Sequence, residues 1–277
     1  MAAPAASPAT ARAAAPSGAR AVLLVVEHFW TWYRRNWRST AVSSVLQPLL
    51  MLLAFGMGLG SLVSPSAATG NMDYLVYLAP GLLAVAAVQI ATGESSYPVL
   101  SGFKWSRIYH AMTATPLSAG QVMAGQLTWV GLRVLASGAA YLAVIAVFGG
   151  VRGLGAVLAL AFATLCGLSV AAPIMAFAAS MHREGNAFSA LFRFVILPMT
   201  LFSGTFFPVS QLPAWSHPLA WASPLWHSTE LARAAALGTL GSGLAPLPAL
   251  GHACYLLALL VAGVAVAVWR FRVRLYV

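Results

Sequence analysis

The stretch Leu154–Met181, LGAVLALAFATLCGLSVAAPIMAFAASM, decides the fold class of this 277-residue chain. It contains no charged side chain, and it is longer than the ~20 apolar residues that a helix needs to cross a bilayer. Hydrocarbon offers a backbone no hydrogen-bond partners, and the chain shows no alternating pattern of barrel strands. The stretch is therefore predicted to be a transmembrane helix.

The rest of the chain has the same character. Apolar residues make up 60% of it and charged residues only 7%, against roughly 25% charged in soluble domains. The sequence predicts an all-α integral membrane protein in which residues 21–277 form one transmembrane domain. Six segments are long and apolar enough to span: Val42–Val63, Leu75–Thr92, Val122–Phe148, Leu154–Met181, Ala187–Phe207 and Leu250–Trp269.

Basic residues are distributed unevenly over the connections between these segments. Of the 15 Lys and Arg residues, Arg133 lies inside a span and only Arg152 and Arg233 lie on the side away from the termini. Basic residues favour the cytoplasmic side of a membrane. We therefore expect both termini to be cytoplasmic, and the net charge of +10 to reflect topology rather than nucleic-acid binding.

The N-terminal region divides into two parts. Residues 1–20 are rich in Ala, Pro and Ser and are predicted to be a disordered cytoplasmic tail. Residues 22–38 form an amphipathic pattern that predicts a helix lying in the headgroup region, or an aromatic belt at the start of the first span. The aromatic residues of this helix and the arginines opposite them are Phe29, Trp30, Tyr33, Trp37, Arg34 and Arg38.

Residues 93–119 form a basic, aromatic segment between the second and third spans. A helix is predicted from about Val99 to Thr113, ended by Thr115-Pro116, with Ser118 capping the next span. A plain connection needs only about six residues. The segment is either a helix on the membrane surface or a docking element for a cytoplasmic partner. Its predicted contact residues are Phe103, Lys104, Trp105, Arg107, Ile108, Tyr109 and His110.

Residues 208–249 are broken by six prolines and contain three tryptophans. They predict one or two short helices that re-enter the outer leaflet, or tryptophans in an interfacial belt. Arg133 costs roughly 2.5–3.5 kcal/mol at mid-span on insertion scales if it is unpaired. It is expected to face the bundle or a wet cavity, where it makes a structural pair or contacts substrate.

Three motifs carry a resemblance to a known family. They are YLAPGLLA (Tyr77–Ala84), Glu94 followed by FKWSRIYHAMTATPLS (Phe103–Ser118), and LFSGTFFPVSQLPAWSHPLAWASPLWHSTELAR (Leu201–Arg233). With the six-span layout, the chain after residue 20 resembles the membrane subunit of ABC type-2 exporters, nearest to nodulation-factor and drug-resistance permeases. Membership would place this chain in a bacterial cell membrane.

The resemblance implies roles for particular residues. Segment 93–119 would carry a coupling helix seated on a separate ATPase, with Glu94 at its membrane end and Phe103–Pro116, including Thr115, as the docking surface. Segment 208–249 would cover the export pathway. Phe202, Phe206 and Phe207, with Arg133, would line or close its outer gate, although plain helix packing also accounts for them.

The resemblance also implies cofactors and partners. A P-loop needs Gly-Lys-Ser/Thr, but Lys104, the chain's single lysine, is followed by Trp105. The chain itself is expected to bind no cofactor or metal, and ATP and Mg would sit on two copies of the partner ATPase. Other expected partners are a second or paralogous permease and membrane lipid, with no nucleic acid. Drug, glycolipid and lipo-oligosaccharide substrates remain open.

Two other function classes deserve comparison with this reading. A six-span intramembrane serine protease would need a Ser–His pair, for which Ser203 and His252 are the candidates, but Ser203 lacks a Gly-x-Ser-Gly setting. An ion-coupled carrier would need ionisable relays within the spans. The predicted spans contain no carboxylate apart from Glu94 at a border, so this class is disfavoured.

Overall fold

The computed structural model describes residues 17–51, 53–54, 58, 74–147, 154–182, 186–238 and 249–276. Every regular element in these ranges is helical. The α-helices are α1 (Gly18–Met51), α2 (Tyr74–Ser95), α3 (Tyr97–Lys104), α4 (Ile108–Thr113), α5 (Ala119–Val147), α6 (Leu154–Ser180), α7 (Ala187–Leu191), α8 (Leu197–Phe202), α9 (His217–Trp221), α10 (Pro224–Ala236) and α11 (Ala249–Tyr276). A π-helical turn, η3 (Phe192–Ile196), and two 3-10 turns, η4 (Val209–Gln211) and η5 (Ala214–Ser216), complete them.

Four helical stretches in the described residues are long and apolar enough to cross a membrane: Tyr74–Lys104, Ala119–Ala146, Leu154–Ser180 and Ala249–Tyr276. They correspond to the second, third, fourth and sixth predicted spans. Two of them extend beyond the predicted bounds. The second span continues through a bend at Ser96 into α3, and α11 continues past Trp269 to Tyr276.

The fifth predicted span, 187–207, is shorter than expected. Its helical part ends at Phe202, and it is interrupted by the π-helical turn η3 ahead of Pro198. Gly204 has a φ of +74°, a left-handed conformation that glycine adopts readily and that ends the helix. Apolar composition extended to Phe207, but the backbone does not stay helical that far.

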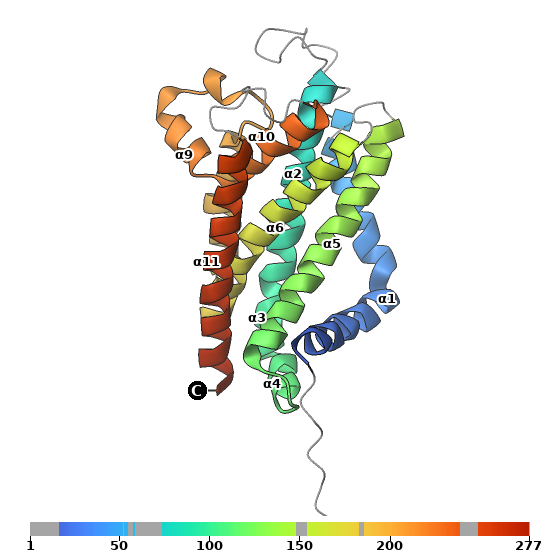
Figure 1. The fold of residues 1–277 in the computed structure, drawn as a ribbon, viewed down its shortest axis with the longest axis vertical. Coiled ribbons are helices and arrows are strands. Elements are labelled where there is room, and N and C mark those ends of the chain that lie inside the picture. The colour runs from blue at the N-terminus through green and yellow to red at the C-terminus, as the bar shows by residue number, and fades with distance from the viewer. Residues whose placement is uncertain are drawn as a thin grey trace, which may run out of the picture.

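The N-terminal region is a single helix where two elements were predicted. α1 runs unbroken from Gly18 to Met51, so no break in the backbone separates the predicted headgroup helix from the predicted first span. Figure 1 shows its first part lying across the long axis of the bundle and its later part turning along that axis. Residues 1–16 of the predicted tail (1–20) and most of the first span beyond Met51 lie outside the described residues, and residues 18–20 of that tail belong to α1.

α6 is the central helix of the bundle. It packs against α2, α5, α10 and α11, and Figure 1 shows it crossing the bundle diagonally. Its buried residues are mostly small, and Gly167 faces the Ala87 carbonyl so closely that an added Cβ would lie 3.2 Å from that oxygen. Small residues let membrane helices approach closely and gain packing energy.

The two ends of the bundle carry different elements. The α4 end holds α3, α4, the start of α1 and the last turns of α11 (Figure 1). The α10 end holds α9 and α10, the short helices into which residues 208–238 fold. Whether the α9–α10 region re-enters a membrane stays a prediction.

Candidate functional site

The segment between α2 and α5 folds as two short helices instead of the single predicted one. α3 ends at Lys104, Arg107 adopts a left-handed conformation with φ +50°, and α4 begins at Ile108. A non-glycine residue there costs about 1–2 kcal/mol. On a continuous helix the six-residue separation would place Phe103 and Tyr109 about 120° apart. The break brings both rings into the same buried cluster.

Phe103 and Tyr109 are buried within the chain, where exposed contact residues were predicted. They are 3% and 1% exposed, their ring centroids are 4.8 Å apart, and each packs against Phe271 of α11. The Tyr109 hydroxyl donates to Gln126 Oε1 at 3.1 Å. Burial raises the pKa of the Tyr109 phenol, so that group stays a neutral donor.

Arg274 secures this cluster, which we call the aromatic anchor (Phe103, Tyr109, Phe271). Its guanidinium lies 4.4 Å from the Phe103 ring centroid, and Nη1 donates to the carbonyls of Ala178 and Ala179 at 3.0 Å. The last carbonyls of a helix lack partners within that helix. Arg274 therefore closes the end of α6 and covers the anchor at once.

The remaining predicted contact residues form the outer surface of the segment. Trp105 is 51% exposed, Arg107 and His110 are also exposed, and Lys104 and Ile108 are half-buried. Thr115 and Pro116 are exposed where the chain turns into α5. We call Lys104–Arg107 with His110 the exposed turn. The segment thus separates a buried aromatic base from a basic, aromatic exterior.

The end of this segment is capped as predicted. The Ser118 hydroxyl accepts from the Gln121 N–H at 3.3 Å, and Gln121 Oε1 accepts from the Ser118 N–H at 2.8 Å. This reciprocal pair is a capping box, which satisfies two N–H groups at the start of α5. It fixes where the segment stops and α5 begins.

Arg133 is buried and paired, as one of the predicted alternatives required. Its Nε donates to Glu94 Oε1 at 3.1 Å, and its guanidinium lies 4.5 Å from the ring centroid of Tyr33. Arg133 is 5% exposed, and the three residues come from α5, α2 and α1. Removing one partner of a buried ion pair leaves an uncompensated charge. This Arg133 cluster (Arg133, Glu94 and Tyr33) lies halfway along α5 and links three helices electrostatically.

The predicted aromatic face of α1 is divided. Phe29 and Tyr33 pack on Trp129 of α5, with ring centroids 6.1 and 5.6 Å away. Trp30 and Trp37, each 52% exposed, point elsewhere. Arg34 and Arg38 are exposed as well, with Arg38 5.9 Å from the Trp37 ring centroid.

A glycine sets how closely α1 approaches α5. A Cβ added at Gly125 would lie 2.5 Å from the Cβ of Val25. The two backbones are therefore as close as the side chains allow. This contact holds Tyr33 within reach of Arg133.

A second buried arginine lies at the α10 end, and the sequence analysis missed it. Arg233 is 9% exposed; it donates to Glu230 at 2.9 Å and to the carbonyls of Gly204 and Tyr77 at 3.1 and 3.4 Å. Its guanidinium also lies 3.9 Å from the Tyr77 ring centroid, and the Tyr77 hydroxyl donates to Gly204 at 3.2 Å. The three-residue spacing of Glu230 and Arg233 was the available signal, but Arg233 was read as a loop charge.

The three predicted gate phenylalanines occupy different surroundings. Phe202 contacts the Trp215 ring at 5.7 Å, Phe206 is half-buried, and Phe207 is 56% exposed. The Phe206 carbonyl accepts from the Tyr74 hydroxyl at 3.2 Å. Arg133 contacts Glu94 and Tyr33, so the structure does not bring it to these rings. A pathway role for the phenylalanines stays a prediction.

The candidate protease pair makes hydrogen bonds to other partners. The Ser203 hydroxyl bonds to the Thr200 carbonyl at 3.2 Å and the Thr205 hydroxyl at 2.7 Å. His252 Nδ1 lies 2.8 Å from His227 Nδ1. These bonds do not assemble a nucleophile with a base. Within the described ranges, no three His, Cys, Asp or Glu side chains gather as metal ligands.

The chain matches the family model described as "ABC-2 type transporter" over residues 20–237, well over half its length. The chain belongs to the ABC-2 type transporter family. Nodulation protein J of Sinorhizobium fredii is 31% identical over 78% of this chain and 85% of that protein. The same-named proteins of Rhizobium leguminosarum bv. trifolii and Rhizobium meliloti are 32% and 29% identical, over 74% and 76% of this chain and 80% and 82% of theirs.

The ABC-2 match covers both arginine clusters and the exposed turn. It ends before α11, which supplies Phe271 and Arg274 to the aromatic anchor. Membership in the ABC-2 family marks the chain as a membrane transport subunit and confirms the resemblance. It also argues against the protease and ion-coupled classes.

Proposed function

We propose that this chain is the permease subunit of an ATP-driven exporter, and that its exposed turn docks on a separate ATPase subunit. One observation carries the proposal. A basic, aromatic turn stands at the α4 end on a fully buried base that packs against α11 and hydrogen-bonds to α5. A loop that only connected two spans would need no such base.

The contacts of the exposed turn provide a route by which movement of a docked ATPase could reach the long helices. Packed interiors transmit displacement because they hold few voids. A push on Trp105 or Arg107 would reach α11 through Phe103 and Phe271, whose ring centroids are 4.8 Å apart. A push along α3 would reach α5 and α1 through the bend at Ser96, next to Glu94, and the Glu94–Arg133 bond. Both routes end in helices long enough to span a membrane or lie along it.

The wider assembly follows from this docking. We propose two permease copies above two ATPase subunits, with ATP and Mg bound by the ATPases, in a bacterial cell membrane. The α4 end would face the cytoplasm because most basic residues of the described helices belong to it. The substrate class that fits is amphipathic or lipid-linked: a drug, a glycolipid or a lipo-oligosaccharide.

Co-purification with the ATPase encoded alongside the gene tests this proposal. The variant Trp105→Ala/Arg107→Glu alters only exposed side chains, so the fold should be kept and ATPase recovery should fall about tenfold or more. Trp and Arg are the side chains that most often dominate interface energy. Trp215→Ala removes a tryptophan at the α10 end that is 66% exposed, against 51% for Trp105; it is the control and should recover wild-type amounts.

The result against the proposal is equally definite. Wild-type recovery of the ATPase by the Trp105→Ala/Arg107→Glu variant, with normal size-exclusion elution, would exclude the exposed turn as the docking site. ATP hydrolysis by the purified permease alone would contradict the assignment of ATP to a separate subunit.

A further inference from the structure

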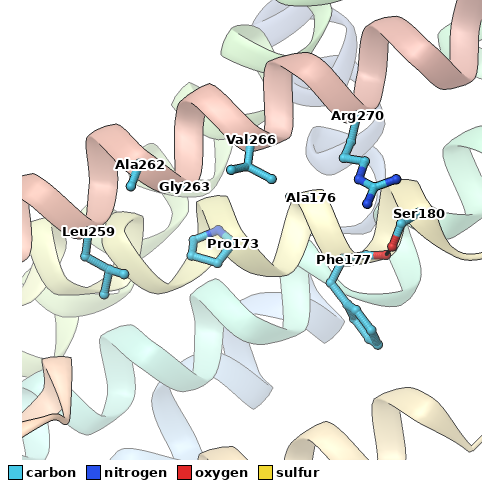
Figure 2. Close-up of a pocket in the computed structure, with 9 residues that line it drawn as sticks. All are labelled: Pro173, Ala176, Phe177, Ser180, Leu259, Ala262, Gly263, Val266 and Arg270. Carbon is cyan, nitrogen blue, oxygen red and sulfur yellow. Dashed lines mark hydrogen bonds between the residues drawn. The ribbon is translucent and has the colours of Figure 1, made fainter.

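A groove of about 380 Å³ runs between α6 and α11. Figure 2 shows its lining, with Pro173, Ala176 and Phe177 contributed by α6 and Ala262, Gly263 and Val266 by α11. It is open along one side, and its volume lies within the ~300–1,000 Å³ of small-molecule sites. The groove is separate from the exposed turn and from both arginine clusters.

The helices approach closely beneath this groove. A Cβ added at Gly263 would lie 2.6 Å from Pro173 Cδ and 3.0 Å from the Ala172 Cβ. Small residues therefore form the floor, while Phe177 and Val266, 39% and 47% exposed, form the walls. The result is a shallow apolar channel parallel to the helices rather than a closed pocket.

The groove is polar at one end only. Ser180 and Arg270 lie there together, and the other lining residues are apolar (Figure 2). Within the described part of the chain, Arg270 pairs with no carboxylate; its guanidinium lies 4.4 Å from the ring centroid of Trp269. Trp269 is 55% exposed. An arginine beside an exposed tryptophan is typical of a helix at the membrane–water interface.

The length of the groove matches one membrane leaflet. Leu259, at the apolar end, and Arg270, at the polar end, are eleven residues apart on α11, which at 1.5 Å per residue is about 16 Å. Half of a ~30 Å hydrocarbon core is about 15 Å. A ligand with its charge at Arg270 and its tail along the groove would therefore reach the bilayer midplane.

We propose that this groove binds one anionic phospholipid, with its phosphate on Arg270 and one acyl chain along Pro173, Ala176 and Gly263. The charge of Arg270 selects a net negative headgroup, and the apolar channel selects a chain rather than a folded ligand. The proposal rests on the membrane setting of α6 and α11 in the proposed function. It makes the lipid a fixed part of the surface around α11, the helix that also completes the aromatic anchor.

Native mass spectrometry of the purified full-length chain tests this binding. The chain is equilibrated with equal amounts of phosphatidylglycerol and phosphatidylcholine, and the retained lipids are counted. The wild type should retain phosphatidylglycerol in preference. Arg270→Gln should lower that preference about fivefold, because each basic residue near an anionic lipid surface adds an attraction of this size. Arg270→Lys should keep the preference.

Two further variants localise the lipid. Arg272→Gln removes the same charge from an exposed residue outside the groove, and it should bind as the wild type does. Ala262→Phe fills the apolar channel without changing charge, and it should lower retention of both lipids. Equal retention of the two lipids by the wild type would overturn the proposal, as would an unchanged preference in Arg270→Gln.

These readouts are independent of the ATPase. Arg270→Gln leaves the exposed turn intact, so ATPase co-purification should be unchanged. Loss of lipid preference with normal ATPase recovery supports the groove. A groove that fails this lipid test while the exposed turn still docks the ATPase would refute only the present inference.

Discussion

Two clusters, one at the α10 end and one halfway along α5, each hold a buried arginine with a glutamate and a tyrosine ring, but they use these parts differently. Arg233 bonds to Glu230 on its own helix and to two backbone carbonyls. Arg133 reaches side chains on two other helices, Glu94 and Tyr33. A contact to backbone fixes a local fold, whereas a contact between side chains of separate helices links bodies that can move. The α10-end cluster is therefore suited to holding a fixed local fold, and the Arg133 cluster to passing movement from one helix to another.

Removing Arg233 should have the largest effect. Arg233→Met leaves Glu230 without its cation and removes one donor from each of two buried carbonyls, so we expect a loss of about 3–5 kcal/mol. Thermal unfolding of the purified chain measures it, with Arg272→Met as the exposed control. A melting temperature equal to that of the control would show that the α10-end cluster is dispensable.

Removing Arg133 should cost less stability but loosen a specific contact. Arg133→Gln should destabilise by about 2 kcal/mol and raise hydrogen exchange in the first part of α1, because the ring of Tyr33 loses its cation. Arg233→Met should not raise exchange there. In a double-mutant cycle with Glu94→Gln, the coupling energy should lie between about 0.5 and 3 kcal/mol. Strict additivity would show that Glu94 and Arg133 act separately.

Forcing α1 away from α5 tests whether their close packing holds Tyr33 against Arg133 in the Arg133 cluster. Even a Cβ at position 125 would lie 2.5 Å from the Cβ of Val25, and Gly125→Val adds two methyl groups beyond it. Overpacking should therefore cost about 1–3 kcal/mol and weaken the contact between Tyr33 and Arg133. Gly120→Ala on the same helix meets its nearest neighbour at 3.7 Å and is the matched control. Adding Val25→Ala should restore part of the loss in melting temperature. If Val25→Ala restores none of the melting temperature, the strain does not arise at the contact between residues 25 and 125.

The smallest effects are expected when the tyrosine of each arginine cluster is changed to phenylalanine. Tyr77→Phe removes the hydroxyl that donates to Gly204, which should cost about 1 kcal/mol. Tyr33→Phe should stay within about 0.5 kcal/mol, because the ring is what Arg133 contacts. Chemical unfolding curves of the two variants decide it. Equal losses would mean that the tyrosines have the same role.

The sequence predicted that a given residue would be buried better than it predicted which residues it would contact. An arginine inside an apolar run predicted that Arg133 would be buried and in need of a partner, but nothing in the sequence paired it with Glu94, 39 positions away. Arg233 was missed because prolines on both sides made its helix look like a loop. Its partners, Gly204 and Tyr77, are distant in sequence.

Predictions based on helical periodicity were wrong where the backbone stops being helical. On one continuous helix Phe103 and Tyr109 would lie about 120° apart, but the left-handed Arg107 separates α3 from α4 and both rings are buried in the same cluster. Hydropathy likewise extended the fifth span to Phe207, although the helix ends at Phe202. By contrast, the Ser118–Gln121 capping box was predictable because it depends on residues three positions apart.

The position of the aromatic anchor in the chain has a consequence for biosynthesis. Phe103 and Tyr109 are made early, but Phe271 and Arg274, which cover them, belong to the last helix. Chains emerge and fold from the N-terminus onward. The exposed turn, which we propose as the docking surface, therefore reaches its final shape only after α11 has been synthesised and packed. A nascent permease would stay inert toward its ATPase until the whole bundle is complete.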